Sequence, residues 1–182
     1  MQKLLFLDRD GVINKDIGYL SQINDIVFLD GIYELIERAL NNKFKIVIVT
    51  NQSGIARKYF TEKQFHQIMS HMINHLVETI KNLKIDDISY YFCPHLPEDK
   101  CTCRKPLAGL FNACQKNFTM DIDWKNCIMV GDKITDIIAS ESMGVTSNYL
   151  LVSEQTCDID HDNSEISFAF NKIIHLNEVK VI

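Results

Sequence analysis

Three short polar segments directly follow apolar runs in the sequence. They are Asp8-Arg9-Asp10-Gly11, Thr50-Asn51-Gln52-Ser53 and Gly131-Asp132-Lys133. Because ligands bind at the carboxyl ends of strands in an open parallel sheet, we expect the three segments to converge on one site. Asp8 and Asp10 lie two positions apart, so their carboxylates leave an extended chain on the same side. Together with Asp132 they form an oxygen-rich site that suits Mg²⁺.

These residues suit phosphoryl transfer. A carboxylate such as Asp8 can attack phosphorus, and a second acid such as Asp10 can protonate the leaving oxygen and later activate water. The transferred group also needs donors and a fixed cation. We expect Thr50 to supply a hydroxyl, and Lys105, at the start of a helix opened by Pro106, to supply the cation. Each residue alone is an ordinary turn or surface residue, so the hypothesis depends on their combination.

A second cluster lies between the last two of these segments. It consists of Cys93, His95, Cys101 and Cys103, the Cys₃His set typical of a closed tetrahedral structural zinc site. Four protein ligands leave no open position for a catalytic water. Arg104 and Lys105 follow the last ligand directly, so we expect bound zinc to fix both side chains at the pocket mouth.

Apolar runs bounded by turn residues predict five buried strands, over residues 4–7, 45–49, 88–92, 128–130 and 148–152. Their lack of polar alternation is typical of a parallel sheet covered on both faces. Helical periodicity lies between the strands. This alternation predicts an α/β fold with a doubly wound parallel sheet.

Sequence signals indicate where the expected helices begin and end. One apolar stripe runs over residues 32–40, and a longer one over 65–80 follows a capping box formed by Thr61 and Gln64. The third helix is expected from Pro106, and the fourth over residues 135–143, with Gly144 as its C-cap. Residues 156–164 read as a surface loop, and residues 171–182 are ambiguous between helix and strand.

Composition narrows the class of protein. With 182 residues and 46% hydrophobic residues, we expect residues 1–182 to form a single domain. A net charge of −5 argues against a nucleic-acid or membrane partner. The first apolar run is too short for a signal peptide or a membrane span. We therefore expect a soluble, cytoplasmic monomer that acts on a small phosphorylated metabolite.

In combination, these residues resemble the four ordered motifs of the haloacid dehalogenase-like phosphatases, over residues 4–144. The matching residues are Asp8-x-Asp10, Thr50, Lys105 and Gly131-Asp132-x-x-x-Asp136. The resemblance implies a Rossmann-like core without a large cap. It also implies Asp8 as nucleophile and Mg²⁺ ligand, and Asp10 as general acid/base that also ligates Mg²⁺ through its carbonyl. Thr50 and Lys105 would contact the phosphoryl group, and Asp132 would bind Mg²⁺.

The Cys/His loop is similar to one branch, which holds the heptose-1,7-bisphosphate 7-phosphatases and the histidinol-phosphate phosphatases. Residues 16–19 and 50–57 resemble the heptose enzymes, whereas the short loop over residues 93–101 resembles the histidinol phosphatases. We give the first signal more weight, because those segments flank the phosphate site and loop length tolerates change. By this resemblance the substrate contacts are Asp16, Gly18, Tyr19, Thr50, Asn51, Gln52, Ser53, Arg104, Lys105 and Lys133.

The resemblance thus implies a Mg²⁺-dependent phosphatase with a structural Zn²⁺. It would remove the 7-phosphate of a heptose 1,7-bisphosphate in the synthesis of nucleotide-activated heptose for lipopolysaccharide core. Two alternatives stay open: a histidinol-phosphate phosphatase of histidine biosynthesis, and a zinc-stabilised binding protein on a phosphatase scaffold. Carbon–halogen hydrolysis is disfavoured, because that chemistry needs neither Asp10 nor a Mg²⁺ ligand such as Asp132.

Overall fold

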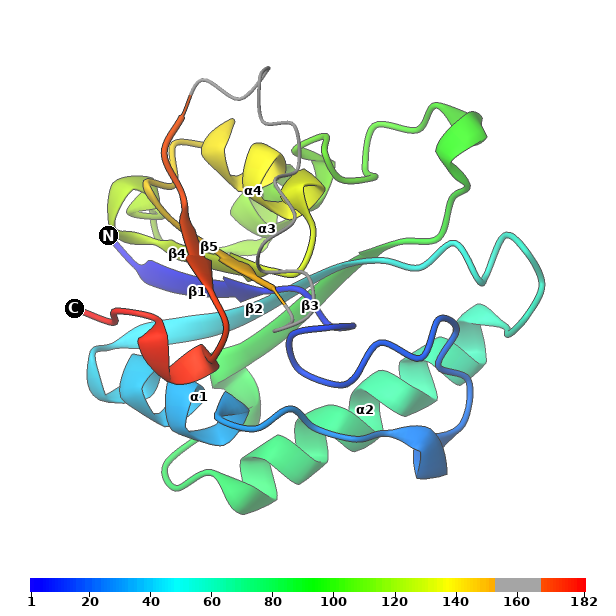
Figure 1. Ribbon diagram of the computed structural model, residues 1–182, viewed down its shortest axis with the longest axis horizontal. Helices are drawn as coiled ribbons and strands as arrows, with labels where there is room; N and C mark the ends of the chain where they lie inside the picture. The colour runs from blue at the N-terminus through cyan, green and yellow to red at the C-terminus, as the bar shows by residue number, and fades with distance from the viewer. Residues whose placement is uncertain (153–167) are drawn as a thin grey trace.

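The computed structural model describes residues 1–152 and 168–182 of the chain. Its centre is a six-stranded sheet in the order β3-β2-β1-β4-β5-β6, with every neighbouring pair parallel (Figure 1). The strands are β1 Lys3–Leu7, β2 Phe44–Asn51, β3 Ile88–Cys93, β4 Ile128–Gly131, β5 Ser147–Leu151 and β6 Asn171–Ile173. The predicted doubly wound α/β sheet is confirmed. The additional strand, β6, has two of its three residues exposed, so it carries little apolar signal.

Helices cover both faces of this sheet. They are α1 Ile32–Asn41, α2 Glu62–Thr79, α3 Gly109–Asn117 and α4 Ile134–Glu141. Leu5 and Leu7 belong to the apolar layer beneath α1 and α2, whereas Leu4 and Phe6 belong to the layer beneath α3 and α4. Figure 1 shows the two helix pairs on opposite sides of the sheet. Both faces of β1 are therefore buried, which explains its unbroken apolar sequence.

Two expected helix ends are confirmed. At the start of α2, the Gln64 N–H donates to Thr61 Oγ1 (3.2 Å) and the Thr61 N–H donates to Gln64 Oε1 (2.8 Å), which completes the capping box. After α4, Gly144 adopts a φ of 88°. Its N–H donates to the Glu141 carbonyl and that of Val145 to the Ser140 carbonyl, the paired bonds of a Schellman motif.

The predicted start of the third helix is wrong. Helix α3 begins at Gly109 rather than at Pro106. The residues before it form a turn, in which the Leu107 N–H donates to the Arg104 carbonyl (2.9 Å). Gly109 then passes so close to the backbone of Thr102 that a side chain there would overlap it. Packing against the Cys/His loop thus overrides the helix-opening preference of proline, and Lys105 does not lie at a helix N-terminus.

Single 3₁₀ turns complete the described structure, at Ile23–Asp25, Ile85–Asp87, Pro97–Asp99, Trp124–Asn126 and Leu176–Glu178. The ambiguous C-terminal stretch thus contains a short strand and a turn, and the loop expected over residues 156–164 lies outside the described residues. Within residues 1–152 and 168–182, no helix combines the length and apolarity that a membrane span requires.

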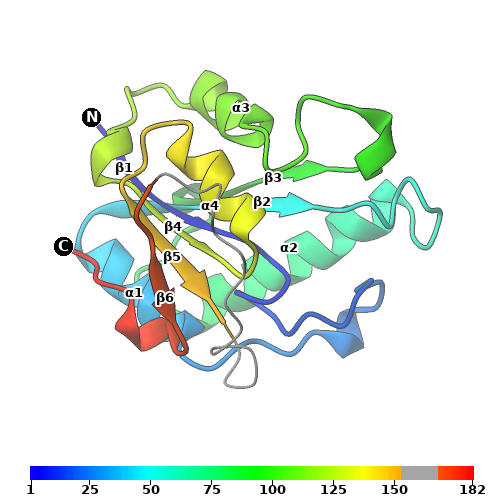
Figure 2. The same cartoon turned by 45° about the horizontal axis from the view of Figure 1, so that its top comes forward.

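The strand order determines where a ligand site can form. From β1 the chain proceeds outward in one direction to β2 and β3, and β4 lies on the other side of β1. This reversal leaves a crevice beyond the carboxyl ends of β1 and β4, where doubly wound proteins bind ligands. Figure 2 shows the strand arrowheads pointing toward one edge of the molecule, where the loops after β2 and β3 project. Asp8 and Asp132 follow β1 and β4 at this edge.

Candidate active site

Asp8 directly follows the innermost strand and lies at the bottom of the site. Its N–H donates to the Val130 carbonyl of β4 (3.0 Å), and the residue is 6% exposed. One carboxylate oxygen, Oδ1, accepts from Lys105 Nζ at 2.9 Å. Burial raises the pKa of Asp8 to about 7, although Lys105 opposes the shift. Water is thus largely excluded from the expected nucleophile, which has a fixed cation beside it.

Lys105 is held by three acceptors. Its Nζ contacts Asp8 Oδ1, donates to the Val49 carbonyl (2.7 Å) and pairs with Asp136 Oδ1 (2.6 Å). Burial alone would lower the pKa of Lys105, but Asp136 and Asp8 outweigh it and the pKa is raised. The charge of Lys105 is therefore stabilised by two carboxylates. Asp136, the last residue of the fourth motif, is its closest partner.

Asp8, Asp132 and Asp136 form a group that we call the carboxylate cluster. Each offers an oxygen, and these oxygens lie within 4.8 Å of one another. Asp132 Oδ1 is buried and has no hydrogen-bond partner in the described part of the chain. Gly11, with a φ of 83°, lies so close to the Asp132 carboxylate that a Cβ would touch it. An orphaned carboxylate oxygen beside other hard oxygen donors fits Mg²⁺.

The Asp10 side chain does not belong to the carboxylate cluster. Arg9 contacts both of its carboxylate oxygens, with Nη2 at 2.7 Å from Oδ2 and 2.9 Å from Oδ1. Asn14 Nδ2 donates to Oδ1 (3.0 Å) and Gln52 Nε2 to Oδ2 (2.9 Å). The carboxylate of Asp10 is thus separate from the carboxylate cluster, and its carbonyl remains the expected Mg²⁺ contact. Sequence reasoning missed Arg9 because the side chains of adjacent residues are expected to point away from each other. It missed Asn14 because that residue is brought to Asp10 by the turn after Gly11.

The segment at the carboxyl end of β2 uses its side chains to position the site. Thr50 is 1% exposed, and its Oγ1 accepts from Gln52 Nε2 (2.8 Å). The Asn51 side chain donates to the Lys105 carbonyl and accepts from the Lys105 N–H, both at 3.1 Å. The amide nitrogens of Asn51 and Gln52, two expected substrate contacts, are therefore engaged within the protein. Both residues, and Ser53, still line the cleft described next.

A cleft of about 530 Å³ brings together all the substrate contacts expected from sequence. Its lining includes Asp8, Asp10, Asp16, Gly18, Tyr19, Thr50, Asn51, Gln52, Ser53, Arg104, Lys105 and Lys133. At its mouth, Lys133 Nζ lies 3.3 Å from both Asp16 Oδ2 and Asp132 Oδ2. Burial lowers the pKa of Lys133, but the Asp132, Asp16 and Asp8 charges outweigh it, so the pKa is raised. The cleft thus holds one deep cation and further cations nearer its mouth.

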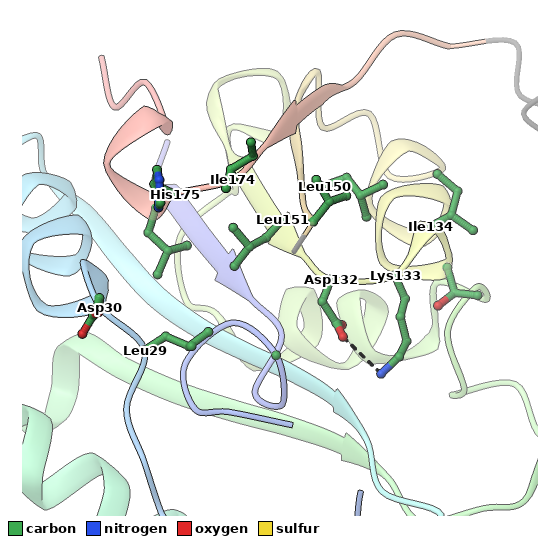
Figure 3. Close-up of a pocket in the computed structure, with 13 residues that line it drawn as sticks. Leu29, Asp30, Asp132, Lys133, Ile134, Leu150, Leu151, Ile174 and His175 are labelled. Atoms are coloured by element: carbon green, nitrogen blue, oxygen red, sulfur yellow. Dashed lines mark ion pairs between the residues drawn. The ribbon is translucent and has the colours of Figure 1, made fainter. Parts of the chain in front are cut away.

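A larger cavity of about 800 Å³ lies on the other side of Asp132 and Lys133 (Figure 3). Figure 3 shows aliphatic side chains around it, including Leu29, Leu151 and Ile174. Such a lining offers few donors to a phosphate group. The smaller, polar cleft is therefore the candidate active site.

Four residues form the Cys/His cluster: Cys93, His95, Cys101 and Cys103. Cys103 Sγ lies 3.1 Å from Cys93 Sγ and 3.2 Å from His95 Nδ1, and Cys101 Sγ lies 3.5 Å from Cys93 Sγ. All three thiols are free. Burial raises the pKa of the Cys93 thiol. These ligand atoms converge on one point, as ligands of a single zinc ion do. Arg104 Nη1 donates to the His95 carbonyl (3.3 Å), so Arg104 is tied to this loop.

Known proteins share both the sequence and the fold. The family model described as polynucleotide kinase 3 phosphatase matches residues 6–178. The D-glycero-beta-D-manno-heptose-1,7-bisphosphate 7-phosphatase of Haemophilus ducreyi is 42% identical over 156 residues, covering 82% of this chain and 83% of the relative. The D-glycero-alpha-D-manno-heptose-1,7-bisphosphate 7-phosphatase of Campylobacter jejuni is 42% identical over 153 residues, covering 84% of each chain.

A solved structure is also similar. The crystal structure of D,D-heptose 1,7-bisphosphate phosphatase from B. bronchiseptica, complexed with magnesium and phosphate, matches with a TM-score of 0.70 and 30% identity. The match covers 82% of this chain and 80% of that one.

Proposed function

The chain belongs to the family matched by the polynucleotide kinase 3 phosphatase model and, with its relatives, to the D-glycero-D-manno-heptose-1,7-bisphosphate 7-phosphatases; from this premise we propose that it removes the 7-phosphate of a heptose 1,7-bisphosphate. The observation that carries the proposal is the buried contact between Asp8 and Lys105 at the bottom of a polar cleft. A nucleophile beside a fixed cation is what phosphoryl transfer requires.

In the first step, the Asp8 carboxylate attacks the 7-phosphorus and the bond from phosphorus to the sugar oxygen breaks. Asp10 gives its proton to that leaving oxygen, so the sugar departs as an alcohol and Asp8 becomes an aspartyl phosphate. The Thr50 hydroxyl and the Lys105 ammonium bind the oxygens of the transferred group.

In the second step, Asp10 takes a proton from water as the water attacks the phosphorus of the aspartyl phosphate. This attack releases inorganic phosphate and restores the Asp8 carboxylate. Mg²⁺ would be held by Asp8, Asp132 and the Asp10 carbonyl, with Asp136 beside them, and when bound it supplies charge stabilisation for the phosphoryl group.

The substrate class follows from the cations of the cleft. A bisphosphate keeps a second anionic group after the 7-phosphate is engaged, and we assign that group to Arg104 and Lys133. Asp16, Gly18 and Tyr19 would contact the sugar. Zn²⁺ in the Cys/His cluster would order the loop that carries Arg104. We propose a single phosphatase domain over residues 1–182, acting on a small metabolite in the supply of nucleotide-activated heptose for lipopolysaccharide core.

Replacement of the nucleophile tests the proposal. In Asp8→Asn we expect Mg²⁺-dependent phosphate release to fall by at least about 10⁴-fold, because the attacking carboxylate is gone. Folding by circular dichroism and zinc content should be unchanged. Asp121→Asn, at an exposed position near the amino end of β1, is the matched control and should retain full activity. Retained turnover in Asp8→Asn would contradict the proposed mechanism.

The short Cys/His loop favours one second candidate, histidinol phosphate, so substrates must be compared side by side. We expect catalytic efficiency on the α or β heptose 1,7-bisphosphate to exceed that on histidinol phosphate by more than about tenfold, because only a bisphosphate engages Arg104 and Lys133. The ratio between the two anomers assigns the preferred one. A higher efficiency on histidinol phosphate would replace the heptose assignment.

A further inference from the structure

We propose that Arg9 is a positioning residue for the reaction: its guanidinium holds the Asp10 carboxyl group at the cleft wall, where Asp10 exchanges protons with the leaving group. The inference rests on the proposed function, in which Asp10 is the general acid/base. The sequence motifs assigned no role to Arg9, which is 1% exposed and is among the largest fully buried side chains.

The location of Arg9 follows from strand alternation. Leu5 and Leu7 face the layer of α1 and α2, so Arg9, two residues further, is directed toward the same layer. There its Cζ lies 5.6 Å from the ring centroid of Phe65 on α2. From this position the guanidinium reaches back to Asp10, its neighbour in sequence. A cation thus occupies a position where the preceding pattern has leucine.

Burial makes the pairing with Asp10 obligatory. A buried charge is costly unless it is paired and hydrogen-bonded. Asp10 is the acidic partner of Arg9 among the described ion pairs, and Arg9 Nη1 has no hydrogen-bond partner in the same part of the chain. The charge is therefore balanced by one carboxylate, and moving that carboxylate away would leave the guanidinium unpaired.

The contacts fix the Asp10 group in direction as well as in place. Nε and Nη2 of Arg9 each contact both carboxylate oxygens, at 2.7–3.1 Å, so the fork sets the carboxyl plane. Gln52 and Asn14 each add one neutral donor, and Gln52 joins Asp10 to Thr50. When Asp10 carries a proton, a neutral amide can turn away while the guanidinium retains the other oxygen. The carboxyl group can therefore keep one orientation in both protonation states.

The leaving group provides a test that a purely structural role would not satisfy. An alkoxide leaving from a sugar needs the proton of Asp10, whereas p-nitrophenolate leaves without one. In Arg9→Gln we expect kcat/KM for heptose 1,7-bisphosphate to fall by about 10²-fold, the usual effect of a misplaced catalytic group. For p-nitrophenyl phosphate the same variant should lose less than about tenfold. Arg9→Lys, which keeps the charge but not the fork, should fall between native protein and Arg9→Gln on the sugar substrate.

The matched control is Arg38→Gln. Arg38 donates to the Leu176 and Val179 carbonyls far from the cleft, so its loss should leave both kcat/KM values unchanged. Asp10→Asn should show the same selectivity for poor leaving groups, and adding Arg9→Gln to it should cost little more. Equal losses on both substrates in Arg9→Gln, or no loss, would overturn the inference.

Failure of the proposed function has a different signature. In that case native protein hydrolyses neither ester, or Asp10→Asn does not discriminate between the leaving groups. Thermal unfolding and zinc content show whether each variant folds. If Arg9→Gln does not fold, Arg9→Lys decides by the same criterion: a loss confined to the sugar substrate supports the inference, and an equal loss or none overturns it.

Discussion

The carboxylate cluster and the Cys/His cluster each bring ligands close enough for one ion, but they differ in what balances their charge. Asp8 and Asp136 in the carboxylate cluster share the Lys105 ammonium, which also donates to the Val49 carbonyl of β2. The described contacts of the thiols and imidazole in the Cys/His cluster are largely with one another. The first cluster is thus assembled by the protein itself.

This difference indicates how each cluster depends on metal. Removing metal from the carboxylate cluster leaves a neutralising cation in place, so the strand ends should keep their geometry. A metal in the Cys/His cluster would join β3 to the loop before α3, so its removal would release that loop. We therefore expect chemistry to depend on the first cluster and substrate recognition on the second.

The largest effect should come from removing the shared cation. In Lys105→Met, kcat should fall by at least about 10³-fold, because a fixed charge on the phosphoryl group is lost. The variant also leaves two buried carboxylates unpaired, at a cost of about 3–5 kcal/mol in the free energy of unfolding. Phosphate release and chemical denaturation measure the two effects. Lys116→Met, on the exposed last turn of α3, is the control; equal behaviour of the two variants would contradict the charge-balance argument.

Loss of the second metal should have a smaller and different effect. After zinc chelation, or in Cys101→Ser, we expect KM for the bisphosphate to rise about tenfold, because Arg104 loses its fixed position and a charged contact weakens. Hydrolysis of p-nitrophenyl phosphate, which lacks the second phosphate, should change little. Restoring zinc should rescue the chelated protein. If kcat falls equally for both substrates, the proposed division of chemistry and substrate recognition between the two clusters is wrong.

The pH dependence of stability and of Mg²⁺ affinity should test the role of Asp8 in the carboxylate cluster. Burial raises the pKa of Asp8 from 3.8 to about 7. In metal-free protein its contribution to stability is therefore fully present below pH 3.8 and is lost as the pH rises to about 7, because the unfolded carboxylate ionises first. Thermal unfolding in a chelator should show this loss, and Asp8→Asn should flatten it.

Below pH 7, Mg²⁺ affinity should rise by roughly tenfold per pH unit, because binding displaces the proton from Asp8. A pH-independent affinity would argue against Asp8 as a ligand.

The sequence predicts the site best where chemistry depends on local position. Asp8, Thr50 and Asp132 follow apolar strands, so the strand-end rule brings them together before any coordinates are known. Cys93 to Cys103 are likewise identified by ligand type and spacing. What the sequence does not reveal are partnerships between distant segments. The two bonds between Asn51 and Lys105 join residues 54 positions apart, and no periodicity encodes them.

Arg9 shows the second limit. Its contact with Phe65 of α2 agrees with strand alternation, but only the packed structure shows that Arg9 is buried and that the guanidinium contacts Asp10. The start of α3 was missed for a related reason, because contact between Gly109 and the Cys/His loop overrides the local signal of Pro106. Residue type and backbone pattern predict which residues belong to the site, whereas tertiary packing determines which residues each of them contacts.

The smallest expected effect concerns Lys133, which lines the cleft beside the carboxylate cluster. Its side chain is 56% exposed and pairs with Asp16 and Asp132 at 3.3 Å. Exposed pairs contribute little to stability, so Lys133→Gln should change the free energy of unfolding by less than about 1 kcal/mol. KM for the bisphosphate should still rise about fivefold. In the native protein KM should depend on salt, because dissolved ions screen this exposed charge, and the variant should lose that dependence. An unchanged KM at low salt would assign the second phosphate to Arg104 alone, and thus to the loop of the Cys/His cluster rather than to the strand-end site.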